Sequence, residues 1–114
     1  MATWEDVVAA ASTLPGVEVS TWYRTPALKV AGKGFVRLRA DDADGALMVT
    51  CGLAEKEALL ASGDPAFFTT PHYDGHGSVL VRLDLVDDAQ LHELVTEAWR
   101  LRAPARSREE RDDA

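Results

Sequence analysis

Five basic side chains and no acidic one occupy residues 21–39, TWYRTPALKVAGKGFVRLR. Clustered lysine and arginine side chains bind phosphate and carboxylate groups, so a run of this kind is typical of a surface that contacts nucleic acid or another anion. The whole chain has a formal net charge of -7. The run therefore indicates one basic face on an otherwise acidic protein. Its cations are Arg24, Lys29, Lys33, Arg37 and Arg39.

Aromatic and histidine side chains add a second kind of binding chemistry. Trp22, Tyr23 and Tyr73 carry rings that can stack on bases or other flat groups. His72 adjoins Tyr73 in the longest irregular segment, and with Arg82 these side chains would line a pocket for a small anion. For Trp22 the alternative is packing at the rim of the core, which we favour.

The same irregular segment spaces His72, Asp74 and His76 at every second position, which superficially resembles a metal site. A metal site in a protein needs three or four converging ligands with supporting hydrogen bonds. Here three candidates sit in a glycine-rich loop that is able to splay them apart. We expect no metal ion.

No motif for catalysis is present. Cys51 is the single cysteine, which excludes an internal disulfide and agrees with a reducing compartment. It follows the apolar residues Leu47 and Val49 in a predicted strand, so we expect an inert thiol in the core. Ser78 has no supporting motif, and no phosphate-binding glycine loop occurs. We expect a non-enzymatic protein without a cofactor.

The size and composition predict one globular domain. The chain has 114 residues, of which 46% are hydrophobic. We expect a domain over residues 1–104 and a flexible, charged tail over 105–114. No apolar run approaches the roughly 20 residues of a membrane-spanning helix, and the acidic N-terminus is unlike a signal peptide. These features predict a cytoplasmic protein with no membrane contact, and we expect a monomer.

The hydrophobic periodicity predicts three amphipathic helices. They cover residues 4–14 with Thr3 as N-cap, residues 53–61, and residues 88–102 with Asp87 as N-cap and Gln90 three residues later. Between them, strands are expected at 17–22, 27–30, 35–39, 47–51, 67–69 and 79–85. A turn at Gly32-Lys33 would join the second and third strands, and Thr25-Pro26 would interrupt the first. The prediction is a two-layer α+β fold, an antiparallel sheet of about five strands with helices on one face.

Alternation along these strands divides the sheet into two faces. The apolar residues Leu28, Val30, Val36, Leu38, Val79, Val81, Leu83 and Leu85 should point at the helices. The opposite face, which we call the open face, should carry Lys29, Phe35, Arg37, Arg39 and Arg82. Basic side chains on the solvent side of a sheet are ordinary, and this remains the alternative explanation. The absence of acidic neighbours on these strands favours binding.

Several short motifs follow one another along the chain. They are Leu14-Pro15-Gly16-Val17, Thr21-Trp22-Tyr23, Thr25-Pro26-Ala27-Leu28-Lys29-Val30, Gly32-Lys33-Gly34-Phe35, the helix at 55–60, and Thr70-Pro71-His72-Tyr73 followed by residues 79–83. Their order and spacing resemble the MmcQ/YjbR family, over residues 4 to 104. The resemblance implies a compact α+β fold, similar in shape to the type III secretion chaperone-like and CyaY-like group. It also implies DNA binding through a double-wing motif, with residues 29–37 and 67–82 as the wings. Two positions depart from the pattern: Thr50, where many relatives carry a lysine, and Gly77-Ser78, where many carry an aromatic residue.

The sequence thus supports two candidate functions. The first is a small non-enzymatic module that binds DNA weakly, chiefly through phosphate. Its contacts would be Arg24, Lys29, Lys33, Arg37, Arg39 and Arg82. The alternative is a domain that binds a small anionic ligand or an acidic partner protein. That site would use the open face and the loop at 70–78, with Trp22, Tyr23, His72 and Tyr73.

Overall fold

The computed structural model of the protein describes residues 2–22, 24–39, 46–71, 73 and 75–113. Within these ranges the chain begins and ends in helices, with strands and two further helices between them. The elements are α1 (Trp4–Ala11), β1 (Val17–Trp22), β2 (Thr25–Val30), β3 (Lys33–Leu38), β4 (Ala46–Thr50), α2 (Leu53–Ala61), β5 (Phe67–Phe68), β6 (Ser78–Arg82), α3 (Asp88–Arg102) and α4 (Ala105–Asp113).

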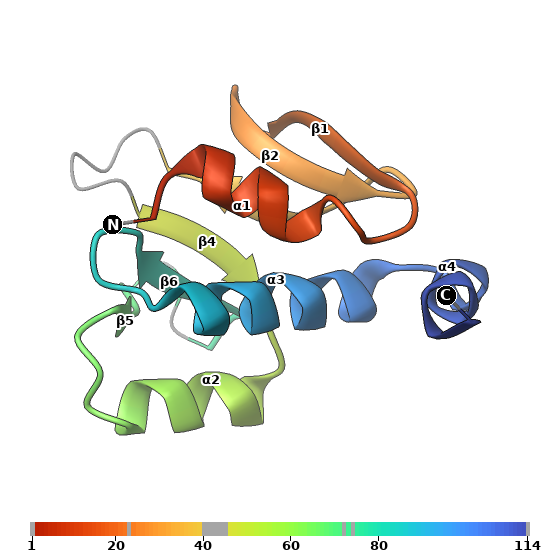
Figure 1. The fold of residues 1–114 in the computed structure, drawn as a ribbon. Helices are drawn as coiled ribbons and strands as arrows, with labels where there is room; N and C mark the ends of the chain where they lie inside the picture. Colours follow the sequence, from red (N-terminus) through yellow and green to blue (C-terminus); the bar gives the residue numbers. More distant parts are fainter. Residues whose placement is uncertain (1, 23, 40–45, 72, 74, 114) are drawn as a thin grey trace.

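One antiparallel sheet organises the fold. Its six strands, within the described ranges, lie in the order β1-β2-β3-β4-β6-β5. Helices α1 and α3 lie side by side across one face (Figure 1), and α3 packs against β3 and β4. Helix α2 packs beside β5 and β6. The predicted two-layer α+β architecture is therefore confirmed, with six strands where about five were expected.

The main core lies between this sheet and its helices. Leu28, Val36 and Val49 stand next to one another in the register of β2, β3 and β4, and all three are fully buried. Val79 continues the row on β6. Leu91 and Trp99 of α3 belong to the same core cluster as this row of strand residues. The alternation in the sequence placed Leu28, Val36 and Val79 correctly, because one face of the sheet must be covered for the domain to fold.

The helix ends follow the local sequence. Thr3 and Asp6 form the capping box of α1, in which each side chain bonds the backbone N–H of the other residue. Asp87 is the N-cap of α3 as predicted, but its side chain makes no capping hydrogen bond. In the part of the chain that the structure describes, no helix is both long and apolar enough to cross a membrane.

The prediction for Phe35 was wrong. Its ring is fully buried in the core and not on the open face. The cause is a β-bulge: Leu28 pairs with Val36, but the next residue, Lys29, pairs with Gly34. Phe35 is the extra residue on β3, so it and Val36 both reach the core. Simple alternation cannot anticipate this shift.

The two hairpin turns also differ from the prediction. Val30 pairs with Lys33, so the β2–β3 turn consists of Ala31 and Gly32 and not Gly32-Lys33. Both turn residues have positive φ, 51° and 77°, as a type I′ turn requires. Thr25-Pro26 does not interrupt a strand. It begins β2, where a missing proline N–H is tolerated.

Strand β6 ends earlier than the sequence predicted. It stops at Arg82, and the chain turns through hydrogen bonds from Leu85 and Val86 N–H to the Arg82 carbonyl. Leu83 still reaches the core, but Leu85 is largely exposed, so its predicted place under the helices was wrong. Leu38 is half-buried and packs against the core edge.

The last described segment is the helix α4, in the range where the sequence predicts a mobile tail. This helix stands beyond the C-terminal end of α3 and away from the sheet (Figure 1). Its sequence, ARSREERDD, is charged on all sides, so it has no apolar face to bury. Among the side chains that the structure describes here, Arg106, Arg108 and Glu109 are exposed, and the flexible tail stays a prediction.

Candidate functional site

Two arginines of the open face converge on Tyr73. Arg37 donates from Nη1 to Thr25 Oγ1 at 3.4 Å and from Nη2 to the Tyr73 hydroxyl at 3.0 Å. The guanidinium of Arg39 lies over the Tyr73 ring, 5.2 Å from its centre. This geometry is that of a cation–π contact. Tyr73 therefore joins the loop at 70–78 to the basic strand β3.

A buried lysine holds this loop in place. Lys56 of α2 is 4% exposed, and its ammonium donates to the carbonyl oxygens of Tyr73 and His76. Turn hydrogen bonds from Tyr73 N–H to Thr70 O and from His76 N–H to Tyr73 O shape the same segment. Burial of a lysine is tolerated only when its donors are satisfied, as they are here by carbonyls.

The open face is consequently covered in part. Ala27 and Leu80 on this face are fully buried, and Met48 between them is 5% exposed. Beside Met48 the face opens into a cavity of about 590 Å³. Its lining comes from strands, from the loop and from the end of α3. The lining residues are Trp22, Arg37, Met48, Thr50, Tyr73, His76, Gly77, Ser78 and Arg102.

The charge of this cavity is positive. Arg37 and Arg102 line it, and no aspartate or glutamate stands among the described residues of its lining. Arg102 is exposed in the last turn of α3. Volumes of roughly 300–1,000 Å³ are usual for small-molecule sites, and a few polar groups on mostly apolar walls fix the ligand. The arrangement suits an anion of modest size.

Trp22 forms one wall because Gly34 leaves room for it. A Cβ atom added to Gly34 would lie 2.5 Å from Cε3 of the Trp22 ring, closer than real side chains approach. The indole therefore lies against the bare backbone of β3. The sequence favoured packing of Trp22 at the rim of the core over a place in a binding site. In the structure Trp22 is half-buried and also lines the cavity.

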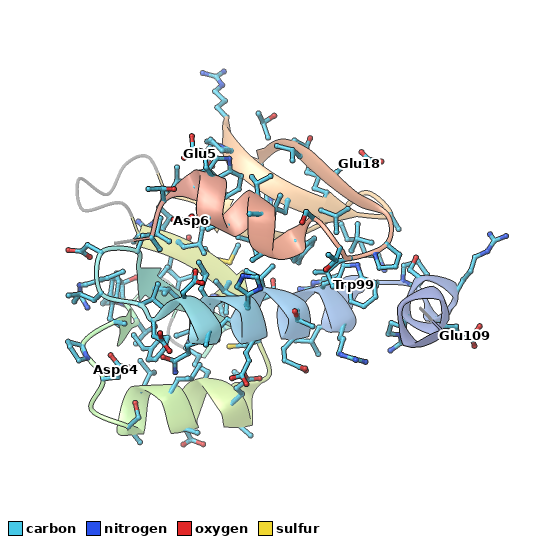
Figure 2. All side chains as sticks on the ribbon, in the orientation of Figure 1. Glu5, Asp6, Glu18, Asp64, Trp99 and Glu109 are labelled. Carbon is cyan, nitrogen blue, oxygen red and sulfur yellow. The ribbon has the colours of Figure 1, made fainter. Side chains whose placement is uncertain are left out.

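The remaining predicted cations do not gather at this site. Arg24 lies in the turn before β2, and Lys33 begins β3 just after the turn at the other end of β2; both are exposed. Lys29 has an acidic neighbour after all, because Glu18 on the edge strand β1 pairs with it in register. Figure 2 labels Glu18 on that outer strand. Arg82 donates to Pro65 O at 2.7 Å and lies over the Phe68 ring, 4.0 Å from its centre.

Two predicted residues, Tyr23 and His72, lie outside the described residues, as does Asp74. Among the described residues no group of three or more histidine, cysteine or acidic side chains is placed to hold a metal ion. Cys51 is buried in the core as predicted. Burial, and then the nearby Glu55 carboxylate, raise the pKa of its thiol to about 11, although Lys56 opposes the shift. The thiol therefore stays protonated at neutral pH.

Sequence reasoning missed several residues of the site. Neither Lys56, in the polar helix LAEKEALLA, nor Arg102, in the last turn of α3, was among the predicted site residues. Thr50 and Ser78 were noted as departures from a family pattern, and they turn out to be register partners that both line the cavity. The pairing of β4 with β6, which leaves out the intervening β5 and α2, was needed to bring them together.

Comparisons with known proteins agree on one family. The YjbR family model matches residues 12–101. Uncharacterized protein Rv2570 of Mycobacterium tuberculosis and uncharacterized protein Mb2600 of Mycobacterium bovis are each 35% identical to the chain, over 91% of both partners. The crystal structure of Deinococcus radiodurans protein DR2400, with a DUF419 family-model domain, superposes with a TM-score of 0.77 and 20% identity. The match covers 98% of this chain and 89% of that one.

Proposed function

The chain belongs to the YjbR family, and we propose that it is a non-enzymatic module that binds a small anionic ligand in the cavity of the open face. The observation that carries this proposal is the lining: Arg37 and Arg102 line the cavity together with Trp22 and Tyr73, and no described acidic side chain joins them. Arginine binds phosphate and carboxylate through paired N–H donors, and the aromatic walls exclude water from the contact.

The architecture around the cavity supports the same function. Lys56 fixes the loop backbone, and Arg37 fixes the Tyr73 hydroxyl, so the walls are ordered before any ligand arrives. A site that is already ordered loses less conformational entropy on binding. Arg102, in contrast, is exposed and bonds no other described residue, which suits a side chain that meets the ligand first.

Anions are expected to raise the melting temperature of the protein, because a ligand that binds only the folded state stabilises it by mass action. We predict this shift with millimolar pyrophosphate in a thermal-shift assay. Arg102→Ala should remove most of the shift, since an exposed cation of the cavity lining is lost. A charged hydrogen bond contributes about 1.5–3 kcal/mol, so affinity should fall by at least about tenfold.

Arg106→Ala is the matched control, because Arg106 is an exposed arginine on α4 that does not line the cavity. It should leave the shift unchanged. The proposal fails if phosphates and carboxylates all leave the melting temperature unmoved. It also fails if Arg102→Ala and Arg106→Ala reduce the shift equally, because the effect would then be one of net charge.

Weak nucleic-acid binding is the second candidate, and one observation favours it. Arg37, Arg39 and Arg82 share the open face, and strands β3, β4 and β6 carry no acidic residue. Arg24 and Lys33 extend this basic character to the turns at the two ends of β2. The pairing of Lys29 with Glu18 and the partial cover of the face by Tyr73 reduce the surface that a duplex would meet.

Fluorescence anisotropy with labelled single-stranded and duplex oligonucleotides at low salt tests this candidate. Binding through phosphate should weaken linearly on a log–log plot against salt, with a slope near -0.9 per duplex phosphate contact. The double variant Arg24→Glu with Lys33→Glu should weaken it further, because both side chains are exposed. An affinity that changes neither with the salt concentration nor in the charge-reversal variant would count against nucleic acid as the ligand.

A further inference from the structure

Two hydroxyl groups belong to the cavity lining. Thr50 on β4 and Ser78 on β6 pair in register and are 5% and 7% exposed. Both residues line the cavity, and neither hydroxyl bonds another residue of the described ranges. Neither oxygen is among the fully buried atoms that lack a partner, so both are open to a ligand in the cavity. A hydroxyl both donates and accepts, so this pair fits a polar edge of either kind.

Another part of the lining is flat and aromatic. The Trp22 indole lies against the backbone at Gly34, where any side chain would displace it. Met48, in register with Arg37, supplies an apolar and polarisable surface next to the two hydroxyls. Aromatic rings and thioethers pack well against flat rings, and stacking of a base on an aromatic side chain changes affinity strongly.

The cavity lining also carries charge. Arg102 comes from the end of α3, while Thr50 and Ser78 come from the sheet. A ligand that satisfies all three features has a flat ring, a polar atom on the ring edge and a negative group. At about 590 Å³ the cavity accommodates a molecule of mononucleotide size.

We infer that the cavity takes a heteroaromatic anion. The ring lies along Trp22, its polar edge meets the Thr50 and Ser78 hydroxyls, and its carboxylate or phosphate meets Arg102. This inference rests on the proposed function and adds the ring as the feature that is recognised. The phosphate of a nucleotide and the carboxylate of a smaller heteroaromatic acid present the same chemistry to the site.

Isothermal titration of the unmodified protein with two matched pairs tests the inference. Adenosine 5′-monophosphate is compared with ribose 5-phosphate, which keeps the phosphate but lacks the ring. Nicotinate is compared with cyclohexanecarboxylate, which keeps the carboxylate but is neither flat nor polar at its edge. In at least one pair the ring-bearing anion should bind about tenfold more tightly, as expected for one stacked base. The pair that shows the gain identifies the source of the anionic group.

Equal affinity within both pairs would overturn the inference and leave the proposed function standing. Absence of binding by all four compounds would overturn both. The double variant Thr50→Val with Ser78→Ala removes the hydroxyls with little change of shape, and it should abolish the gain from the ring while ribose 5-phosphate binds as before. If the folded double variant still binds the ring-bearing anion more tightly than its ringless match, the two hydroxyls do not recognise the ring.

Discussion

Replacing Trp99 with alanine is expected to lower the free energy of unfolding by about 3–5 kcal/mol. Trp99 is fully buried, and its Nε1 donates to Pro15 O at 3.0 Å. Figure 2 labels it between α3 and the turn that leads into β1. The substitution removes the largest side chain of the core and leaves the Pro15 carbonyl without its donor. Urea denaturation followed by circular dichroism measures the loss.

Two further variants separate packing from hydrogen bonding. Trp99→Phe keeps most of the ring and should cost less than alanine, mainly the hydrogen bond and some volume. Trp4→Ala is the control, because Trp4 is half-buried at the start of α1 and only packs against the core edge. If the alanine variants at 99 and 4 lose equal stability, Trp99 does not hold α3 to the α1–β1 turn as described.

Replacing Lys56 with methionine is expected to lower the free energy of unfolding by about 2–3 kcal/mol. Methionine fills a similar volume, but it cannot donate to the Tyr73 and His76 carbonyls that the ammonium now satisfies. A hydrogen bond from a charged group is stronger than a neutral one, and two are lost together. The loop should also open locally, which faster hydrogen exchange at the Tyr73 and His76 amides would report.

The matched control is Lys33→Met, which removes the same ammonium from an exposed position at the start of β3. Exposed substitutions of this kind usually change stability by no more than about 0.5 kcal/mol. A Lys56→Met protein that is as stable as Lys33→Met, with unchanged exchange in the loop, would show that Lys56 does not secure the wall formed by Tyr73.

The fold was largely predictable because its signals are local and repeated. Helix α2 was predicted with its observed limits, and Thr3 and Asp87 were identified as N-caps. Alternation placed Leu28 and Val79 in the core correctly. The errors fall where a single residue changes the register. The bulge at Phe35 and the turn at Ala31-Gly32 depend on how β2 meets β3, and nothing in either strand alone specifies that pairing.

The site was predictable only in part, because it is assembled from distant segments. Arg37, Tyr73 and Trp22 were identified by their types, and the structure brings them together on one cavity. Lys56 and Arg102 were not predicted as site residues, since burial and convergence are properties of the fold. Conversely, the predicted basic run divides in space: Arg24 and Lys33 lie at opposite ends of one strand.

The most direct test of an anion site on the open face is a ¹H–¹⁵N correlation spectrum recorded during titration with adenosine 5′-monophosphate. We predict progressive shifts of the amides of Arg37, Thr50 and Ser78 and of the Trp22 indole N–H, with little change along α2 or at Lys33. Shifts confined to the exposed turns at either end of β2, or spread evenly over every basic residue, would contradict a cavity that selects its ligand.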